Sequence, residues 1–454
     1  MNESKRYAVG LDLGTSTISA AVLDLHSGAL AASRTVPNDT ALDSTGVERE
    51  HDAAALCRKA QALLDSLLDE IGGAACIGLT GQMHGIVYRS GQGELLSPLM
   101  TWQDGRAGVG DPSPCQRIAD LTGYETAPGY GLATCYADLL AGRIPAGTAK
   151  LATVMDCFGC RLTGRADPLV HAGNAASLGL FDLERMDFDR SAVRMLGLDP
   201  GILPAVTTRA EILGSYHGIP VSTAIGDNQA AFLGSVRDPD SMVLANFGTG
   251  SQISLTVQPG APVRTSRSAE LRPFLENRML ASGSALYGGA AYALLEHFFG
   301  RYAAEAGWPG TEQYEVMNRL ALEAAQAGRF LHVRTTFGGT RDDPALRGMI
   351  SDIGAEDFTP GALAAGVLRG MAEELYSLYE RFPHDSVRTL VLSGNAARKN
   401  PALPKIAQMV FGLPALIPVC REEAALGAAL FAADAAGLDA EAARQAFAYR
   451  KVEA

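Results

Sequence analysis

The sequence lacks the basic excess that binding to nucleic acid or to an anionic membrane requires. Its 454 residues hold 38 Lys and Arg against 50 Asp and Glu, a formal net charge of -12. We therefore expect neither nucleic acid nor a membrane as a partner. A bound phosphate group would have to be held locally, by backbone N–H groups, a few cations and a divalent metal.

Long apolar runs and paired cysteines are also missing. No stretch approaches the roughly 20 apolar residues that span a bilayer, and the chain enters a strand by Tyr7, which leaves no room for a signal peptide. The seven cysteines are scattered, and Cys157-x-x-Cys160 has no second pair or histidine cluster nearby. We therefore expect buried reduced thiols, no zinc and a cytoplasmic protein.

The chain does have enough apolar residues for more than one core. Hydrophobic residues make up 47% and charged residues 19% of a chain that is too long for a single core. The segment Arg237-Asp238-Pro239-Asp240 has the composition of a turn. We therefore expect an N-terminal lobe over residues 1–237 and a C-terminal lobe over residues 238–454.

Two similar segments suggest that the lobes are related. Ala8 to Val22 reads AVGLDLGTSTISAAV, and Val243 to Val257 reads VLANFGTGSQISLTV. Each predicts a β-hairpin with a Gly-Thr turn, and the turns differ by one residue. Glycine allows close approach to a ligand, and hydroxyl and N–H groups suit phosphate oxygens. The pair predicts two phosphate loops with these residues: Gly14, Thr15 and Ser16; Gly248 and Thr249. The alternative is two ordinary glycine-bearing hairpins.

The duplication extends beyond the hairpins. In the first half, an amphipathic helix from Asp52 to Ile71 precedes a strand from Cys76 to Thr80. In the second half, an apolar stripe precedes a strand from Arg388 to Leu392; its residues are Leu363, Val367, Met371, Leu375 and Leu378. A third correspondence pairs a strand ending before Gly226-Asp227-Asn228 with one ending before Arg421-Glu422-Glu423. The pattern predicts two α/β lobes whose polar turns follow the carboxyl ends of strands.

These motifs resemble the FGGY family of carbohydrate kinases, in the superfamily of actin, hexokinase and the chaperone ATPases. DLGTS from Asp12 and NFGTGS from Asn246 resemble the two phosphate loops of the family, and SGNAARKN from Ser393 resembles its adenosine loop. The resemblance implies two duplicated lobes of the actin/hexokinase, ribonuclease H-like type, with a cleft for nucleotide and sugar between them. It also implies ATP and Mg²⁺ as cofactors, with Gly394 and Asn395 at the adenosine.

Three further motifs resemble the sugar-binding segments of the family: GQMHG from Gly81, TWQDGR from Thr101 and GDNQAA from Gly226. The resemblance assigns to substrate binding Gln82, Met83, His84, Trp102, Asp104 and Asn228. Carboxylates and amides can accept hydroxyl protons, and a tryptophan gives C–H groups a flat surface. His84 could equally be a buried histidine bonded to a backbone carbonyl.

Two aspartates are the candidates for catalysis and metal binding. Asp227 is expected to be the general base toward the attacking hydroxyl; a carboxylate of ordinary pKa is enough for this role, and a helix N-terminus should keep it ionised. The alternative is a helix cap only. Asp12 lies in an otherwise apolar strand, so it should have a cationic partner. Mg²⁺ is the natural candidate, and a salt bridge to Lys or Arg is the alternative.

Within the family, the segment from Met155 to Glu184 is most similar to sedoheptulokinases. This resemblance implies transfer of phosphate from ATP to the terminal primary hydroxyl of a ketose, sedoheptulose, with xylulose as the alternative. Sugar and ATP are the expected partners of a monomer or homodimer. An actin-like or chaperone-like ATPase would share the phosphate hairpins but would give no reason for GQMHG, TWQDGR and GDNQAA.

Overall fold

The computed structural model describes residues 6–275, 278–310 and 312–453, which fold into two compact units. Unit 1 comprises Met1–Gly234, Arg272–Asn277 and Cys420–Phe447, and unit 2 comprises Ser235–Leu271, Arg278–Val419 and Ala448–Ala454. The first crossing, at Ser235, lies close to the boundary expected at residue 238. The return of Cys420–Phe447 to unit 1 departs from that division.

Unit 1 is built on a six-stranded sheet with the order β13-β14-β5-β1-β2-β3. The strands are β1 (Tyr7–Leu13), β2 (Thr17–Asp24), β3 (Leu30–Pro37), β5 (Cys76–Gly81), β13 (Ile212–Tyr216) and β14 (Ile219–Ala224). β1 and β2 form the predicted hairpin, while β1 and β14 both run parallel to β5. Three parallel strands therefore end at the same edge of the sheet.

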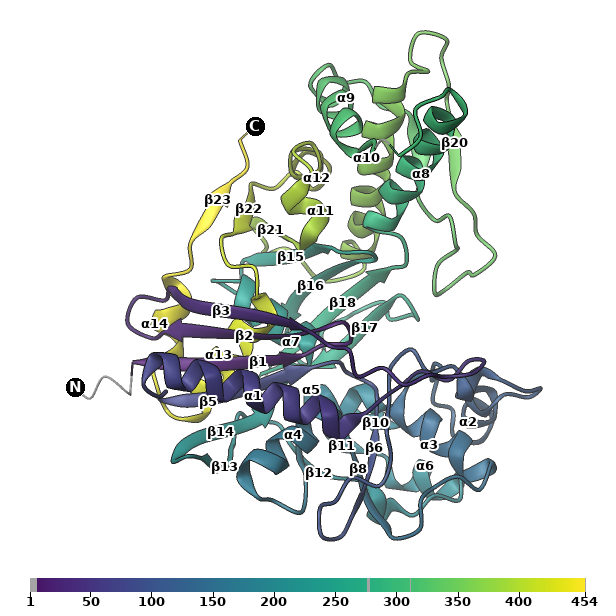
Figure 1. Cartoon of the computed structure of the whole chain (residues 1–454). Coiled ribbons are helices and arrows are strands. Elements are labelled where there is room, and N and C mark those ends of the chain that lie inside the picture. The colour runs from purple at the N-terminus through teal and green to yellow at the C-terminus, as the bar shows by residue number, and fades with distance from the viewer. Residues whose placement is uncertain (1–5, 276–277, 311, 454) are drawn as a thin grey trace. The chain divides into compact units, whose positions relative to one another are not determined.

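Helices cover both faces of this sheet. α1 (Ala53–Ile71) begins at the cap residue Asp52 and buries a leucine face against β1 and β2, as the apolar spacing predicts. α13 (Glu423–Ala435) packs on β1 and β5. A Cβ built on Gly10 would lie 1.8 Å from the backbone oxygen of Ala425 in α13. Because strand side chains alternate, α13 lies on the face opposite α1 (Figure 1).

The rest of unit 1 forms a second core beside the sheet. Its buried residues lie between Ile86 and Leu203. The elements are β6 (Val87–Ser90), α2 (Pro114–Thr122), α3 (Gly131–Leu140), β8 (Thr148–Ala152), β9 (Leu169–His171), α5 (Ala172–Ala175), β10 (Phe181–Asp182), β11 (Asp187–Phe188), α6 (Arg190–Met195) and β12 (Ala205–Thr207). The helix α4 (Val154–Thr163) packs instead on the six-stranded sheet. Two short strands, β4 (Glu50–His51) and β7 (Leu99–Met100), pair beside it.

Unit 2 is built on a seven-stranded sheet with the order β17-β18-β16-β15-β21-β22-β23. The strands are β15 (Met242–Phe247), β16 (Ser251–Val257), β17 (Ala269–Pro273), β18 (Met279–Ala285), β21 (Thr389–Ser393), β22 (Ala415–Pro418) and β23 (Tyr449–Lys451). β15 and β16 form the second predicted hairpin, and β15 runs parallel to β21. The turns of the two hairpins hold four and three residues between paired positions, the expected difference of one.

Helices of unit 2 pack around the long α10 (Pro360–Tyr379), which buries four of the five residues of the predicted stripe. The others are α8 (Gly289–Glu305), α9 (Tyr314–Gln326), α11 (Gly394–Lys399) and α12 (Leu403–Phe411), with the strand pair β19 (His332–Arg334) and β20 (Met349–Ser351). Figure 1 shows α8, α9 and α10 grouped together. Within the described part of the chain, every helix falls short of the length and apolar character that a bilayer crossing demands.

The helix after β22 does not stay with the strand that precedes it. The sequence pairs this strand and helix with β14 and α7 (Asp227–Ser235) as equivalent parts of separate lobes. In the structure, α13 instead completes unit 1 together with α7. A Cβ on Gly427 of α13 would lie 1.8 Å from the backbone oxygen of Ala230 in α7, so the two helices touch backbone to backbone.

Candidate active site

Three carboxyl ends meet at one edge of the unit 1 sheet. Asp12 on β1 pairs in register with Thr80 on β5, and the next position of β5 is Gly81, which opens the predicted sugar motif. β14 ends just before Gly226 and Asp227, at the start of α7. The parallel register thus brings the first phosphate loop, the GQMHG turn and the GDNQAA turn to the same edge.

Asp12 is part-buried, and its Oδ1 is buried without a hydrogen-bond partner in the described structure. Burial, together with the nearby carboxylates of Asp227 and Glu422, raises its pKa from 3.8 to about 7, and burial has the largest effect. Among the described residues, the ion pairs include no Lys or Arg for Asp12, so the structure does not supply the alternative salt bridge. The neighbours of Asp12 are acidic instead.

Asp227 occupies the first position of α7 and is part-buried. Burial raises its pKa, while the positive charge of Arg272 and the N–H of Asn228, which donates to Asp227 Oδ1 at 2.7 Å, lower it. The net shift is upward, so the pKa of Asp227 lies above the ordinary value that would already be enough for a general base. Loss of hydration outweighs the favourable end of the helix.

Glu422 is the member of this acidic group that the sequence did not predict. It lies immediately before α13, and Thr35 Oγ1 donates to its Oε1 at 3.1 Å. The signal was the Arg421-Glu422-Glu423 turn, which we had placed in the other lobe. In the described residues, no group of three or more His, Cys, Asp or Glu is arranged to hold a metal ion. A cation here would therefore rely on one or two carboxylates, with water or phosphate completing its shell.

The first predicted phosphate loop contacts two predicted sugar residues. Trp102 Nε1 donates to Thr15 Oγ1 at 3.0 Å, and Thr15 Oγ1 in turn lies 3.5 Å from Gln82 Oε1. Gln82 is buried, whereas the indole of Trp102 remains 46% exposed and presents a face to solvent. Gly14 is fixed through its carbonyl, which accepts from Asn38 Nδ2 at 2.9 Å, and Ser16 is exposed.

His84 has a positive φ of 71° and is held by Ser177. Its backbone N–H donates to Ser177 Oγ, and its Nδ1 lies 2.6 Å from the Ser177 carbonyl. The ring stacks on Tyr130 with 4.6 Å between centroids. The bond to a backbone carbonyl is therefore present. It fixes the Nδ1–H tautomer and leaves Nε2 as the acceptor of the ring, so the two interpretations of His84 are compatible.

Met83 and Asn228 pack under the GDNQAA turn. A Cβ on Gly226 would lie 2.6 Å from Met83 Sδ, and Arg272 Nη1 lies 3.9 Å from the same sulfur. Asn228 is 8% exposed. Arg272, from β17, is a second residue that the sequence did not single out, because the segment that carries it is remote from every motif.

Asp104 is placed differently from the other predicted sugar residues. Its side chain is fully buried and accepts from the backbone N–H groups of Arg49 and Arg106 and, at 2.8 and 2.9 Å, from the guanidinium of Arg106. Arg106 also pairs with Asp138 and Glu50. Four donors occupy the carboxylate, so in this conformation Asp104 fixes the TWQDGR turn and offers no oxygen to a sugar.

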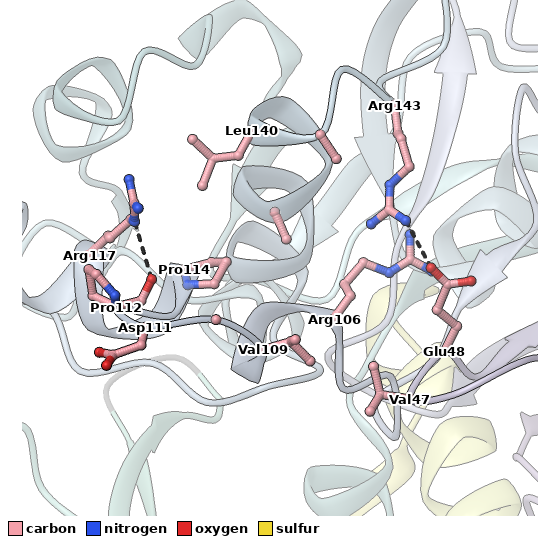
Figure 2. Close-up of a pocket in the computed structure, with 13 residues that line it drawn as sticks. Val47, Glu48, Arg106, Val109, Asp111, Pro112, Pro114, Arg117, Leu140 and Arg143 are labelled. Carbon is pink, nitrogen blue, oxygen red and sulfur yellow. Dashed lines mark hydrogen bonds and ion pairs between the residues drawn. The ribbon is translucent and has the colours of Figure 1, made fainter.

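This ion-pair network borders a cavity of about 620 Å³ in unit 1. Figure 2 shows Arg106, Arg143 and Glu48 together at one end of the cavity and Arg117 with Pro112 at the other, with Leu140 and Val109 between them. Arg143 pairs with Glu48 and Asp138. The arginines at this end are thus neutralised by carboxylates of the protein.

In unit 2, the second phosphate loop and the predicted adenosine loop lie at one edge of the sheet. Asn246 on β15 pairs in register with Ser393 on β21, directly before Gly394. Gly394 has a φ of +87°, and a Cβ there would lie 2.5 Å from the carbonyl oxygen of Phe247. Thr249 and Asn395 are exposed beside these turns.

The start of α8 holds the second loop. The N–H of Gly289 donates to Gly248 O at 2.8 Å, and the N–H groups of Gly288 and Ala290 donate to Thr249 O at 3.0 Å. The predicted nucleotide residues of unit 2 are therefore brought together by the fold.

Comparison with known proteins also divides the chain into an N-terminal and a C-terminal part. Residues 7–111 match the N-terminal domain and residues 247–436 the C-terminal domain of the FGGY family of carbohydrate kinases. The chain is 26% identical to sedoheptulokinase from Mus musculus, over 94% of this chain and 97% of that protein, and 26% identical to sedoheptulokinase from Homo sapiens, with the same coverage. It is 27% identical to glycerol kinase from Aromatoleum aromaticum, over 95% of this chain and 90% of that one.

Solved structures share the fold. Gluconate kinase from Lactobacillus acidophilus matches with a TM-score of 0.81 at 18% identity, covering 98% of this chain and 92% of that one. A xylulose kinase from Brucella ovis matches with a TM-score of 0.81 at 21% identity, covering 98% and 94%. The predicted fold class, two duplicated α/β lobes of the actin and hexokinase type, is confirmed.

Proposed function

The chain belongs to the FGGY family of carbohydrate kinases, and we propose that it phosphorylates the terminal primary hydroxyl of sedoheptulose to give sedoheptulose 7-phosphate. Family membership makes it an ATP-dependent carbohydrate phosphotransferase and removes the filament or chaperone ATPase alternative. The choice of sedoheptulose is supported by the similarity to two sedoheptulokinases over nearly the whole chain.

The observation that carries the chemistry is the environment of Asp227. We assign it as the general base that accepts the proton of the attacking hydroxyl. Its burial raises its pKa, which brings the carboxylate closer to the working pH and makes it a stronger base than an exposed aspartate. Arg272 and the Asn228 N–H favour the ionised form and keep the base competent. Because the transition state of phosphoryl transfer is loose, orientation of the hydroxyl matters more than base strength.

Asp12 fits the role of anchoring Mg²⁺. Its buried oxygen without a partner and the acidic groups around it favour a cation. Hard oxygen ligands are those that Mg²⁺ prefers, directly or through water. When bound, the metal ion would offset the charge of the transferring phosphoryl group. Asp12 would hold the metal ion beside the turn of Gly14, Thr15 and Ser16.

The proposed sugar subsite lies at the same edge of unit 1. Gln82 and His84 Nε2 are assigned to sugar hydroxyls, and the exposed face of Trp102 to the C–H groups of the chain. Met83 and Asn228 shape the wall beside Asp227. We assign Asp104 to positioning: its bonds to Arg106 hold the turn that carries Trp102.

The proposed nucleotide subsite uses unit 2. Gly394 and Asn395 are assigned to adenosine, and Gly248 and Thr249 to the phosphates, with Gly14, Thr15 and Ser16 as the phosphate residues of unit 1. This keeps the functional division at about residue 238, sugar with the N-terminal part and adenosine with the C-terminal part, with α13 added to the former.

A panel of four- to seven-carbon ketoses and polyols tests the substrate assignment through kcat/KM. We expect sedoheptulose to give the highest value, with the phosphate on its terminal hydroxyl by NMR of the product. A higher value for xylulose would replace sedoheptulose by the alternative while leaving the kinase chemistry intact. Equal ATP turnover with and without every sugar in the panel would contradict the proposed function.

A further inference from the structure

Unit 1 contains a second cavity, of about 450 Å³, that none of the sugar or phosphate motifs lines. It lies among the start of α1, the segment that follows β6, and α4. Its buried base is formed by Cys57, Arg89, Cys157 and Cys160. Its exposed rim includes Gln92, Glu94, Arg161 and Arg165. The cavity therefore opens to solvent above a buried arginine.

Arg89 is buried, with only 2% of the residue exposed, yet its guanidinium is only partly hydrogen-bonded. Its Nη2 donates to the carbonyls of Gly93 at 3.0 Å and Arg165 at 3.5 Å. Its Nε and Nη1, which carry three of the five N–H bonds of the group, have no oxygen or nitrogen acceptor in the described residues, and the thiol of Cys160 offers the guanidinium only a weak acceptor. A buried charge with unfilled donors is costly to keep unless something else completes it.

Asp156 is the carboxylate whose charge acts on Arg89, and it offsets the positive charge of the guanidinium only in part. Its Oδ2 accepts from Thr153 Oγ1 and Asn174 Nδ2, and no ion pair joins it to Arg89 within the described structure. Burial raises the pKa of Asp156 to about 7 even with Arg89 acting to lower it. A carboxyl group that is half protonated near neutral pH cannot balance a full guanidinium charge.

The remaining walls suit an anion. Arg161 and Arg165 at the rim face a single acidic lining residue, Glu94. Burial raises the pKa of the thiols of Cys57, Cys157 and Cys160, so these groups are neutral and do not repel a negative ligand. This excess of positive charge stands out in a chain whose net charge is -12.

The cavity in Figure 2 gives a direct contrast. Arginines also line it, but Arg106 and Arg143 are paired with Asp138, and each has a second carboxylate partner. The two arginines at that end of the cavity are thus matched by carboxylates. Arg89 is not, which favours a ligand as its missing partner.

We propose that the cavity at Arg89 binds a small phosphate ester. The phosphate oxygens accept from Arg89 Nε and Nη1 at the base, with Arg161 and Arg165 adding charge at the rim. Arginine is the side chain best suited to planar, multiple hydrogen bonding to phosphate. The volume exceeds the need of a lone phosphate ion and leaves room for a carbon chain of a few atoms.

Isothermal titration calorimetry tests this with 3-phosphoglycerate and, separately, inorganic phosphate. Mg·ADP and sedoheptulose are kept saturating so that the active site is filled. We expect one added site that binds the ester more tightly than inorganic phosphate. Arg89→Met should weaken the site about 10-fold or more, and Arg161→Gln about 3-fold. Arg319→Gln, an exposed residue of unit 2, serves as the matched control and should change nothing.

Equal affinity in wild type and Arg89→Met, or no heat of binding in the wild type up to tens of millimolar, would overturn the proposal. If Arg89→Met fails to fold, Arg161→Gln decides, because its exposed side chain is not needed for the core. Unchanged affinity in that variant counts against the site. Tighter binding of inorganic phosphate than of the ester contradicts the assigned class. The kinase assay is independent of all these outcomes.

Discussion

At the scale of single residues, the site depends on carboxylates whose charge the fold disfavours. Asp12 and Asp227 both have raised pKa values because burial removes their hydration. The carboxylates of Asp227 and Glu422 also contribute to the raised pKa of Asp12. The sequence predicted these two aspartates as candidates but not their ionisation. Besides burial, the pKa values depend on the charges of Glu422 and Arg272, which are distant along the chain.

The acid limb of activity should reveal Asp227. A base must be ionised, so kcat/KM should fall as the pH drops, with an apparent pKa above the 3.8 of an ordinary aspartate. Asp227→Asn should lower kcat by a factor on the order of 10² or more, with little change in the sugar KM. The residual activity of the variant should no longer show the fall in kcat/KM at low pH that Asp227 causes. A variant with wild-type turnover would remove Asp227 from the mechanism.

We expect the buried carboxylate of Asp12 to lower the stability of the ligand-free protein once it is ionised. Its pKa is raised from 3.8 to about 7, so the folded state binds its proton more tightly than the unfolded state. Stability from this group is complete below about pH 4 and is lost as the pH rises through 7. Asp12→Asn should therefore stabilise the protein at pH 8 by on the order of 2 kcal/mol and abolish most activity. Denaturant unfolding at pH 4 should show a much smaller difference.

Trp102 should act through both its ring and its N–H group. Trp102→Ala removes the surface proposed for the sugar and should raise the ketose KM about 10-fold. Trp102→Phe keeps much of the ring area but loses the bond to Thr15, so its effect on the ketose KM should be smaller. Initial-rate kinetics with both substrates varied separates the two. A defect confined to the ATP KM in Trp102→Ala would contradict the assignment.

At the scale of elements, unit 1 depends on α13 lying in direct contact with other backbones. Gly10 and Gly78 leave room for it on the sheet, and Gly427 leaves room for α7. Such contacts are too close for any side chain. The position of Asp227 at the start of α7 and of Glu422 before α13 therefore depends on these glycines.

Two helical glycines make a matched test of this packing. Gly427→Ala in α13 places a methyl group 1.8 Å from Ala230 O and should destabilise the protein by about 3 kcal/mol or more. Gly300→Ala in α8 meets nothing closer than 3.7 Å and should be neutral or stabilising by up to about 1 kcal/mol. Chemical denaturation measures both. Equal effects would show that the α7–α13 contact does not limit stability.

At the scale of the whole molecule, the sequence predicted the repeated parts of the fold well. Both hairpins, α1 with its cap at Asp52, and the α10 stripe follow from local periodicity, which local sequence encodes. The return of α13 to unit 1 does not, because it rests on backbone contacts between segments more than 190 residues apart, as 427 minus 230 shows. The buried ion-pair network around Asp104 also depends on segments that are distant along the chain. Its partner Arg106 is local, but Glu50 and Asp138, which pair with Arg106, are not.

The central claim is that this chain transfers a phosphoryl group from ATP to a ketose with Asp227 as the base. The most direct measurement is product formation from Mg·ATP and sedoheptulose, followed by ³¹P NMR for wild type and Asp227→Asn at matched folding stability. The account predicts sedoheptulose 7-phosphate from the wild type and a rate lower by on the order of 10² or more in the variant. Equal rates in the two proteins, or ATP hydrolysis without any sugar phosphate, would contradict it.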